Sequence, residues 1–127
     1  MSKDWVDDVI EFHDYICYPV RTKPTTENSP KSRTRSEYMM EEVEEYAEAM
    51  YDRDIVEMAD GLADLIYFAI GTALYHGIDL RTVMDEVHKS NMTKTPDSQN
   101  YKNCVKGPDF KKPNIVKALR EGKVRRV

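Results

Sequence analysis

The fold is decided by two acidic segments, Glu41-Glu-Val-Glu-Glu45 and Glu57-Met-Ala-Asp-Gly-Leu-Ala-Asp64, which the short connection Asp52-Arg-Asp54 separates. Eleven of the chain's 23 acidic residues lie between Glu37 and Asp64. Apolar residues recur around both segments at the spacing of a helix, about 3.6 residues per turn. Two helices joined by so short a connection pack antiparallel, so these segments predict a helical hairpin.

The first helix has one apolar stripe with acids beside it. The stripe consists of Met39, Val43, Tyr46 and Met50. At about 100° per residue, Glu42 and Glu45 lie in the row next to this stripe, and Glu41 lies one row farther out. We therefore expect Glu42 and Glu45 to face inward, whereas Glu41 is either a site residue or an exposed helix acid.

The second helix is apolar around almost its whole circumference between Ile55 and Ile70, which is typical of a buried helix. The exception is one polar stripe, formed by Glu57, Asp60, Gly61, Asp64 and Gly71. Buried carboxylates are unfavourable unless they are protonated, paired or bound to a cation. Arg53 is the only basic residue between Glu37 and Asp64, so the pattern predicts a metal site inside a helical bundle.

The ligand types indicate which metal this site would hold. Carboxylates without histidine are hard oxygen ligands, which favour Mg²⁺, with Mn²⁺ possible, and Mg²⁺ commonly recruits substrate phosphates. A di-iron centre would need Glu-x-x-His pairs, and no Glu stands three residues before His13, His76 or His88. Glu57 has a second interpretation, because Asp54 and Glu57 match a capping box at the start of the helix.

The remaining chain predicts an all-α fold, a bundle of four to five helices. We expect helices at about 4–17, 34–51, 55–76 and 79–90, a loop at 18–33, and a helix stop at Gly77. We divide the chain into a helical domain, 1–95, and a basic C-terminal extension, 96–127, that packs on or near the site. The extension is either a solubilising tail, a phosphate-attracting rim or a nucleic-acid contact, and we consider nucleic acid unlikely.

Composition is that of a globular domain. The 127 residues are 40% hydrophobic and 33% charged, with a net charge of −4. The start of the chain lacks the apolar core of a signal peptide, and the longest apolar run, 62–75, is too short for a membrane span and contains Asp64. We expect a cytoplasmic protein without a membrane partner, with Cys17 and Cys104 as reduced structural thiols.

Four stretches carry a family resemblance. They are Arg35-Ser-Glu-Tyr-Met-Met-Glu-Glu-Val-Glu-Glu-Tyr-Ala-Glu-Ala49, Glu57-Met-Ala-Asp-Gly-Leu-Ala-Asp-Leu-Ile-Tyr67, Gly77-Ile-Asp-Leu80 and Glu86-Val-His-Lys-Ser-Asn-Met-Thr-Lys94. Over about residues 1–95 the chain resembles the all-α nucleoside triphosphate pyrophosphohydrolases. These are the MazG-like and phosphoribosyl-ATP pyrophosphohydrolase-like proteins, which are related to the dimeric dUTPases.

The resemblance implies Mg²⁺-dependent hydrolysis of a nucleoside triphosphate to the monophosphate and pyrophosphate. Glu41, Glu42 and Glu45 match the first acidic motif, and Asp64 matches an acid of the second. Relatives often have Glu three residues before that acid, where this chain has Gly61, so either Asp60 takes over as the missing ligand or Glu57-x-x-Asp60 is itself the functional pair. We expect Glu42, Glu45, Glu57, Asp60 and Asp64 as metal ligands and Glu41 as the catalytic residue that activates water.

Phosphate contacts are expected from Arg35, Asn91 and Lys94, although Arg35 and Lys94 could equally be ordinary surface charges. The substrate is expected to be a nucleotide such as dUTP or a related pyrimidine deoxynucleotide. The alternatives are a phosphoribosyl-ATP-type activity and, from another class, a non-catalytic acidic helical interaction protein. The apolar surface exceeds what one short bundle covers, so we expect a homodimer or homotetramer, as in relatives whose sites lie near the subunit interface.

Overall fold

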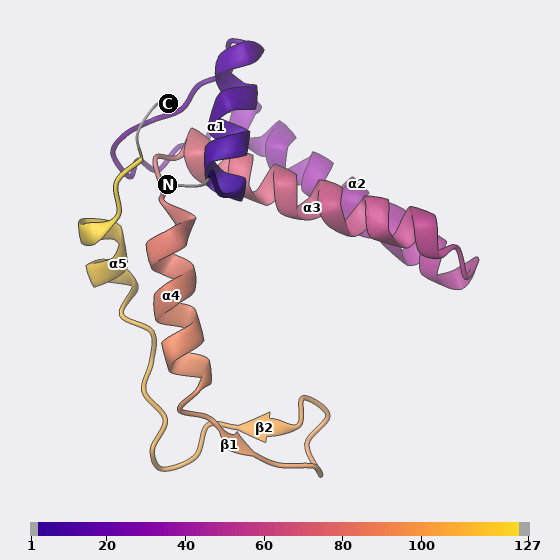
Figure 1. The fold of residues 1–127 in the computed structure, drawn as a ribbon, viewed down its shortest axis with the longest axis vertical. Helices are drawn as coiled ribbons and strands as arrows, with labels where there is room; N and C mark the ends of the chain where they lie inside the picture. Colours follow the sequence, from indigo (N-terminus) through magenta and orange to yellow (C-terminus); the bar gives the residue numbers. More distant parts are fainter. Residues whose placement is uncertain (1–2, 125–127) are drawn as a thin grey trace. The chain divides into compact units, whose positions relative to one another are not determined.

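The computed structural model describes residues 3–124 and consists of helices with one very short strand pair (Figure 1). The chain divides into two compact units, one formed by the chain up to Ile78 with the residues from Lys123, the other by Asp79–Gly122. The elements of the described residues are α1 (Trp5–Tyr15), α2 (Pro30–Tyr51), α3 (Ile55–Tyr75), α4 (Leu80–Asn91), β1 (Thr95–Pro96), β2 (Cys104–Val105) and α5 (Ile115–Glu121). The prediction of an all-α fold is confirmed.

The long helix α2 begins four residues earlier than the predicted start at residue 34. Ser29 is its N-cap and accepts a hydrogen bond from the backbone N–H of Ser32, while the Ser32 hydroxyl accepts one from the N–H of Ser29. Pro30 occupies the first turn, where its missing N–H is not needed. The proline-rich composition that predicted a loop up to residue 33 therefore includes the start of the helix.

The two acidic helices form the predicted antiparallel hairpin (Figure 1). Asp52 ends α2, Arg53 adopts a left-handed backbone with φ of 56°, and Asp54 caps α3. The Asp54 carboxylate accepts a hydrogen bond from the backbone N–H of Glu57 at 3.1 Å. This interaction explains the acid at position 54, because it satisfies one of the free N–H groups at the helix start.

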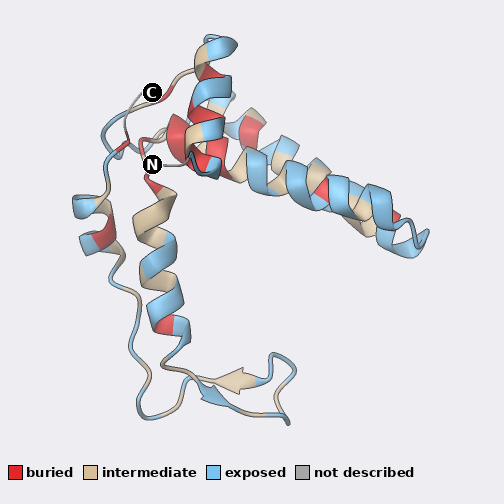
Figure 2. Cartoon of the chain, viewed as in Figure 1, coloured by how far each residue is buried: buried red, intermediate tan, exposed pale blue. Residues whose placement is uncertain are grey.

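The core of the first unit lies where α1 packs against the C-terminal half of α3. Val9, Ile10 and Leu74 are each only 1% exposed. The N-terminal half of α3 lies outside this core, and Ile55 and Val56 are 72% and 71% exposed (Figure 2). The prediction that α3 is buried along its whole length is therefore wrong for the single chain, because α1 covers only one end of the hairpin (Figure 1).

The C-terminal end of α3 is closed by a glycine turn and by the loop that follows α1. Gly77 has a φ of 74°, and a Cβ there would overlap the carbonyl group of Lys23. The backbone N–H groups of Arg21 and Thr25 donate to the carbonyls of Leu74 and His76 at 2.9 and 2.8 Å. The predicted helix stop at Gly77 is confirmed, and the loop satisfies carbonyls that a helix end leaves free.

The second unit contains α4, the strand pair and α5. Asp79 caps α4 by accepting a hydrogen bond from the N–H of Arg81, and the Thr82 hydroxyl donates to the Ala118 carbonyl of α5 at 2.9 Å. The antiparallel strands β1 and β2 pair Thr95 with Val105. The functional division at residue 95 stays a prediction. None of the helices in residues 3–124 combines the length and apolarity needed to cross a bilayer.

Two glycines of α3 give a matched test of this packing. A Cβ at Gly61 would meet the Tyr46 backbone of α2 at 3.4 Å, an ordinary contact, whereas a Cβ at Gly71 would approach the Arg35 Nη2 and His13 Nε2 atoms to 2.8 Å. We expect Gly61→Ala to leave the free energy of unfolding unchanged or raise it by up to about 1 kcal/mol, through helix propensity. Gly71→Ala is expected to lower it by about 1–2 kcal/mol through overpacking.

Urea denaturation of both variants measures the difference, because both substitutions carry the same gain in helix propensity. Equal stability of the two variants would contradict the close packing of Arg35 and His13 against α3.

Candidate functional site

One carboxylate at the α2 and α3 interface lacks the partners that a buried oxygen needs. The Oε2 atom of Glu42 is buried and has no hydrogen-bond partner among the described residues. Burial, followed by the charges of Glu45, Asp64 and Asp60 and a hydrogen bond with Glu45, raises the pKa of Glu42 above its ordinary value. Glu45, Asp60 and Asp64, three predicted ligands from the two helices, therefore lie close enough for their charges to act on a fourth, Glu42.

The cluster is only partly buried. Glu45, Asp60 and Asp64 are exposed, whereas Glu42 has an oxygen shielded from solvent. The prediction of a buried acidic stripe on α3 is therefore wrong for the single chain. The reason is that this part of the hairpin extends beyond α1 (Figure 1), and most of it is exposed (Figure 2).

The donor set fits a hard divalent cation. It consists of carboxylates alone, one of them with an oxygen that nothing in the described part of the chain satisfies. No three histidine, cysteine or acidic side chains of residues 3–124 converge on a common point as they stand. Binding of an ion would therefore require rotation of exposed acids such as Glu45 and Asp64 toward Glu42, which their exposure permits.

Glu41 and Glu57 lie at the margin of the cluster. Both are exposed, and neither is among the charges that raise the pKa of Glu42. The backbone N–H of Glu57 is bound by Asp54, which places Glu57 in the first turn of α3. The roles of Glu41 in catalysis and of Glu57 in metal binding stay predictions.

Gly61 occupies the position where the family resemblance implies an acid. Gly61 is buried, and its Cα faces the backbone of α2 at Tyr46. A longer side chain there would be directed against α2 at the helix–helix contact. Asp60 and Asp64 are α3 acids whose charges raise the pKa of Glu42. The choice between Asp60 and Glu57 as a metal ligand stays a prediction.

Of the three expected phosphate contacts, Arg35 belongs to the same unit as the acids. Its side chain is buried at 7% exposure and donates to the Thr72 hydroxyl at 2.9 Å and the Phe68 carbonyl at 3.3 Å. The interpretation of Arg35 as a surface charge is therefore wrong. Asn91 is exposed at the end of α4, and Lys94 is half-buried beside a cavity of about 610 Å³, both in the second unit. Their roles stay predictions.

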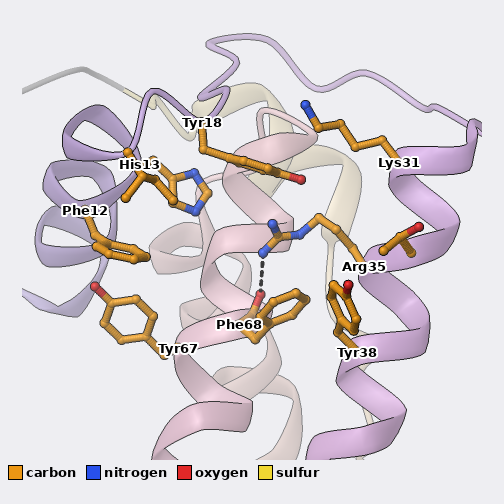
Figure 3. A pocket seen from close by; sticks show the side chains of 10 residues that line it. Phe12, His13, Tyr18, Lys31, Arg35, Tyr38, Tyr67 and Phe68 are labelled. Carbon is orange, nitrogen blue, oxygen red and sulfur yellow. Dashed lines mark hydrogen bonds between the residues drawn. The ribbon is translucent and has the colours of Figure 1, made fainter.

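Sequence reasoning missed a pocket beside the acidic cluster, with a volume of about 380 Å³ (Figure 3). Arg35 lies in it above the ring of Phe68, with 4.1 Å between the guanidinium carbon and the ring centroid. The pocket is lined by Phe12, His13, Ile16, Tyr18, Lys31, Thr34, Arg35, Tyr38, Tyr67 and Phe68. Nothing in the spacing of these residues along the sequence shows that α1 and its following loop meet the hairpin here.

Residues 9–91 match the phosphoribosyl-ATP pyrophosphohydrolase family. The chain belongs to this family. The phosphoribosyl-ATP pyrophosphohydrolase family is part of the all-α nucleoside triphosphate pyrophosphatase superfamily, which has MazG-like members, and the predicted resemblance is confirmed. The chain is thus a hydrolase acting on phosphoric anhydrides, which argues against a non-catalytic interaction protein. A search of curated proteins found no match.

The phosphoribosyl-ATP pyrophosphohydrolase match covers both acidic segments and the residues that line the pocket, and it ends at Asn91. Lys94 and the basic extension therefore lie outside the matched part of the chain.

The repulsion within the cluster predicts an unusual response to substitution. Without divalent cations, Glu42→Gln should raise the free energy of unfolding by up to about 1 kcal/mol, since neighbouring like charges on helices cost about 0.2–0.5 kcal/mol per pair. The new amide can also donate to the Glu45 carboxylate. Urea denaturation in EDTA measures the change, with Glu44→Gln as the matched control on the opposite flank of α2. A Glu42→Gln protein less stable than the native chain would contradict the repulsion.

Proposed function

We propose that the chain is a Mg²⁺-dependent pyrophosphohydrolase that cleaves the bond between the α- and β-phosphates of a nucleoside triphosphate group. The observation that carries this proposal is the buried Glu42 oxygen among the acids of α2 and α3, which has no partner among the described residues. Carboxylate clusters that repel one another are stabilised by a cation, and Mg²⁺ commonly completes its ligand set with phosphate oxygens.

The substrate we favour is of the phosphoribosyl-ATP type, the alternative in the sequence-based prediction. The family match supports this choice. No contact among the described residues favours uracil or deoxyribose, the groups that distinguish dUTP from other nucleotides. Both substrates carry the same triphosphate group, so the reaction at the acidic cluster would be the same. The difference between them lies in what the rest of the nucleotide contacts.

Each acid has a distinct role in the proposed reaction. The cation would be held by Glu42, Glu45, Asp60 and Asp64. Glu57, one turn before Asp60, would be an additional ligand. Bound Mg²⁺ supplies neutralisation of phosphoryl charge and a lowered pKa for water. The exposed Glu41 carboxylate accepts the proton of the attacking water. The water oxygen then bonds to the α-phosphorus, the bond to the bridging oxygen breaks, and pyrophosphate leaves.

Positive charge near the acids would offset their repulsion of the substrate. Arg35 lies seven residues before Glu42 on α2, which corresponds to about 10 Å along a helix. A nucleotide whose triphosphate lies at the acids would reach Arg35 with its remaining part. We propose Arg35 as a contact of this remaining part, and the roles of Asn91 and Lys94 as phosphate contacts stay sequence-based predictions.

The direct test is pyrophosphate release with Mg²⁺ from a panel of phosphoribosyl-ATP, ATP, dUTP and dCTP. We expect release from at least one, highest with phosphoribosyl-ATP, and a loss of about 100-fold or more in kcat/KM for Glu45→Gln and Asp64→Asn, because each removes charge from the cation site. Glu44→Gln, an exposed acid on the other flank of α2, is the matched control and should keep native activity.

Two results would contradict the proposal. One is the absence of release from every substrate by the folded native protein. The other is release that both Glu45→Gln and Asp64→Asn retain. Preference for dUTP would instead restore the pyrimidine deoxynucleotide as the substrate.

We also propose that the chain works as a homodimer or homotetramer. Large apolar side chains stay exposed on both helices of the hairpin, among them Val43, Met50, Ile55, Val56 and Ile66. An apolar surface of this extent is typical of an interaction site. Sedimentation equilibrium at micromolar concentration should give a mass two or four times the 14.8 kDa of the chain. A monomer that still hydrolyses its substrate would contradict this assembly.

A further inference from the structure

We propose that the pocket between α1, α2 and α3 is a ring-binding subsite for a nucleotide, with Arg35 and Lys31 holding a phosphate oxygen of the ligand. The choice of a nucleotide rests on the proposed function. The pocket itself rests on separate observations, namely its aromatic walls, its two cations and its position on the hairpin.

Aromatic rings form the walls of the pocket. Tyr38 and Phe68 meet edge to face with 6.1 Å between ring centroids, and Tyr18 lies across the pocket from them (Figure 3). The volume of about 380 Å³ lies within the range of small-molecule sites. Aromatic side chains bind the planar rings of nucleobases by stacking, whatever the base. The walls therefore suit a planar heteroaromatic ring.

Two cations in the pocket have no carboxylate partner among the described residues. The Nζ atom of Lys31 lies 4.8 Å from the centroid of the Tyr18 ring, and the Arg35 guanidinium lies 5.0 Å from the same centroid. The hydrogen bonds of Arg35 go to a hydroxyl and a carbonyl, which are neutral. Arg35 is buried whereas Lys31 is exposed, and a buried charge without a counter-charge is costly. An anionic group on the ligand would remove this cost.

The other polar groups of the pocket are neutral. Burial, and after it the nearby charge of Arg35, lowers the pKa of His13, whose Nδ1 atom lies 3.2 Å from the Pro19 carbonyl. Burial and the charges of Asp8 and Glu11 raise the pKa of Tyr67, which keeps its phenol protonated. Figure 3 shows Tyr67 on the side away from Lys31. The positive charge is thus concentrated at one side of an otherwise neutral, aromatic pocket.

The pocket lies on the same two helices as the acidic cluster. Phe68 is one turn after Asp64 on α3, and Arg35 is two turns before Glu42 on α2. A nucleotide lying along the hairpin would place its ring at the aromatic walls and its outer phosphates at the acids. Because Tyr38 lies between Arg35 and Glu42 on α2, Arg35 would then hold a phosphate oxygen at the ring end of the ligand, which makes it a specificity-determining residue of the proposed reaction.

The test measures binding without hydrolysis. Isothermal titration calorimetry of the full chain in EDTA would compare adenosine 5′-monophosphate and uridine 5′-monophosphate with their nucleosides and with inorganic phosphate. We expect at least one monophosphate to bind, its nucleoside to bind about tenfold more weakly, and inorganic phosphate to give no measurable binding, because ring stacking and charge pairing both contribute.

Two exposed positions of the pocket provide variants that should fold. Lys31→Gln and Tyr38→Leu are each expected to weaken monophosphate binding by about tenfold. The matched controls are Arg33→Gln, on the same helix and bonded to Asn28, and Tyr51→Leu, at the far end of α2, which should bind as the native chain does. Arg35→Lys, checked by its melting temperature, tests whether the planar guanidinium is required.

The outcomes separate the two proposals. Failure of every monophosphate to bind, binding of nucleoside as tight as that of its monophosphate, or binding that Lys31→Gln and Tyr38→Leu leave unchanged would overturn the subsite. If monophosphates bind as expected but no triphosphate is hydrolysed, the subsite stands and the proposed hydrolysis fails. Hydrolysis that depends on Glu45 and Asp64, without monophosphate binding, would support the proposed hydrolysis and overturn the subsite.

Discussion

The mutual repulsion of carboxylates around Glu42 is the constraint that governs the chemistry of this hairpin. The Glu42 Oε2 atom is withdrawn from solvent by the packing of α2 against α3, and this burial together with the surrounding acids raises the pKa of Glu42. Such an arrangement costs stability unless something positive joins it. We propose that a cation that also binds phosphate offsets this cost and serves the pyrophosphohydrolase reaction.

The hairpin gives this cluster its position relative to the aromatic pocket. Capping by Ser29 and Asp54 fixes where α2 and α3 begin, and thereby fixes which residues face each other across the pair. At Gly61, α3 lies against the α2 backbone at Tyr46. The loop after α1 closes the end of α3 and brings Tyr18 over Arg35. The acidic cluster and the proposed ring-binding pocket therefore lie on the same pair of helices.

Local sequence signals predicted most of the helices and the clustering of the acids. The helical spacing of the acids placed Glu42 beside Asp64, and Gly77 marked the end of α3 correctly. The predicted start of α2 was four residues too late, because proline is typical of loops, whereas here Ser29 caps the helix and Pro30 occupies its first turn. The burial of α3 and the aromatic pocket depend on which other elements pack against the hairpin. The local sequence around Ile55 does not show that α1 leaves it exposed, and that around Tyr18 does not show that it lines a pocket.

The most direct measurement of the proposed cation site is the binding of Mn²⁺, followed by electron paramagnetic resonance, to the native chain, Glu42→Gln and the control Glu44→Gln. We predict saturable binding by the native chain and by Glu44→Gln, and binding weakened at least about tenfold by Glu42→Gln. The reason is that this substitution removes the one acid of the cluster, among the described residues, whose oxygen is buried and unsatisfied. Equal Mn²⁺ affinity for all three proteins, or no binding by the native chain with or without a nucleotide, would contradict a cation site at Glu42.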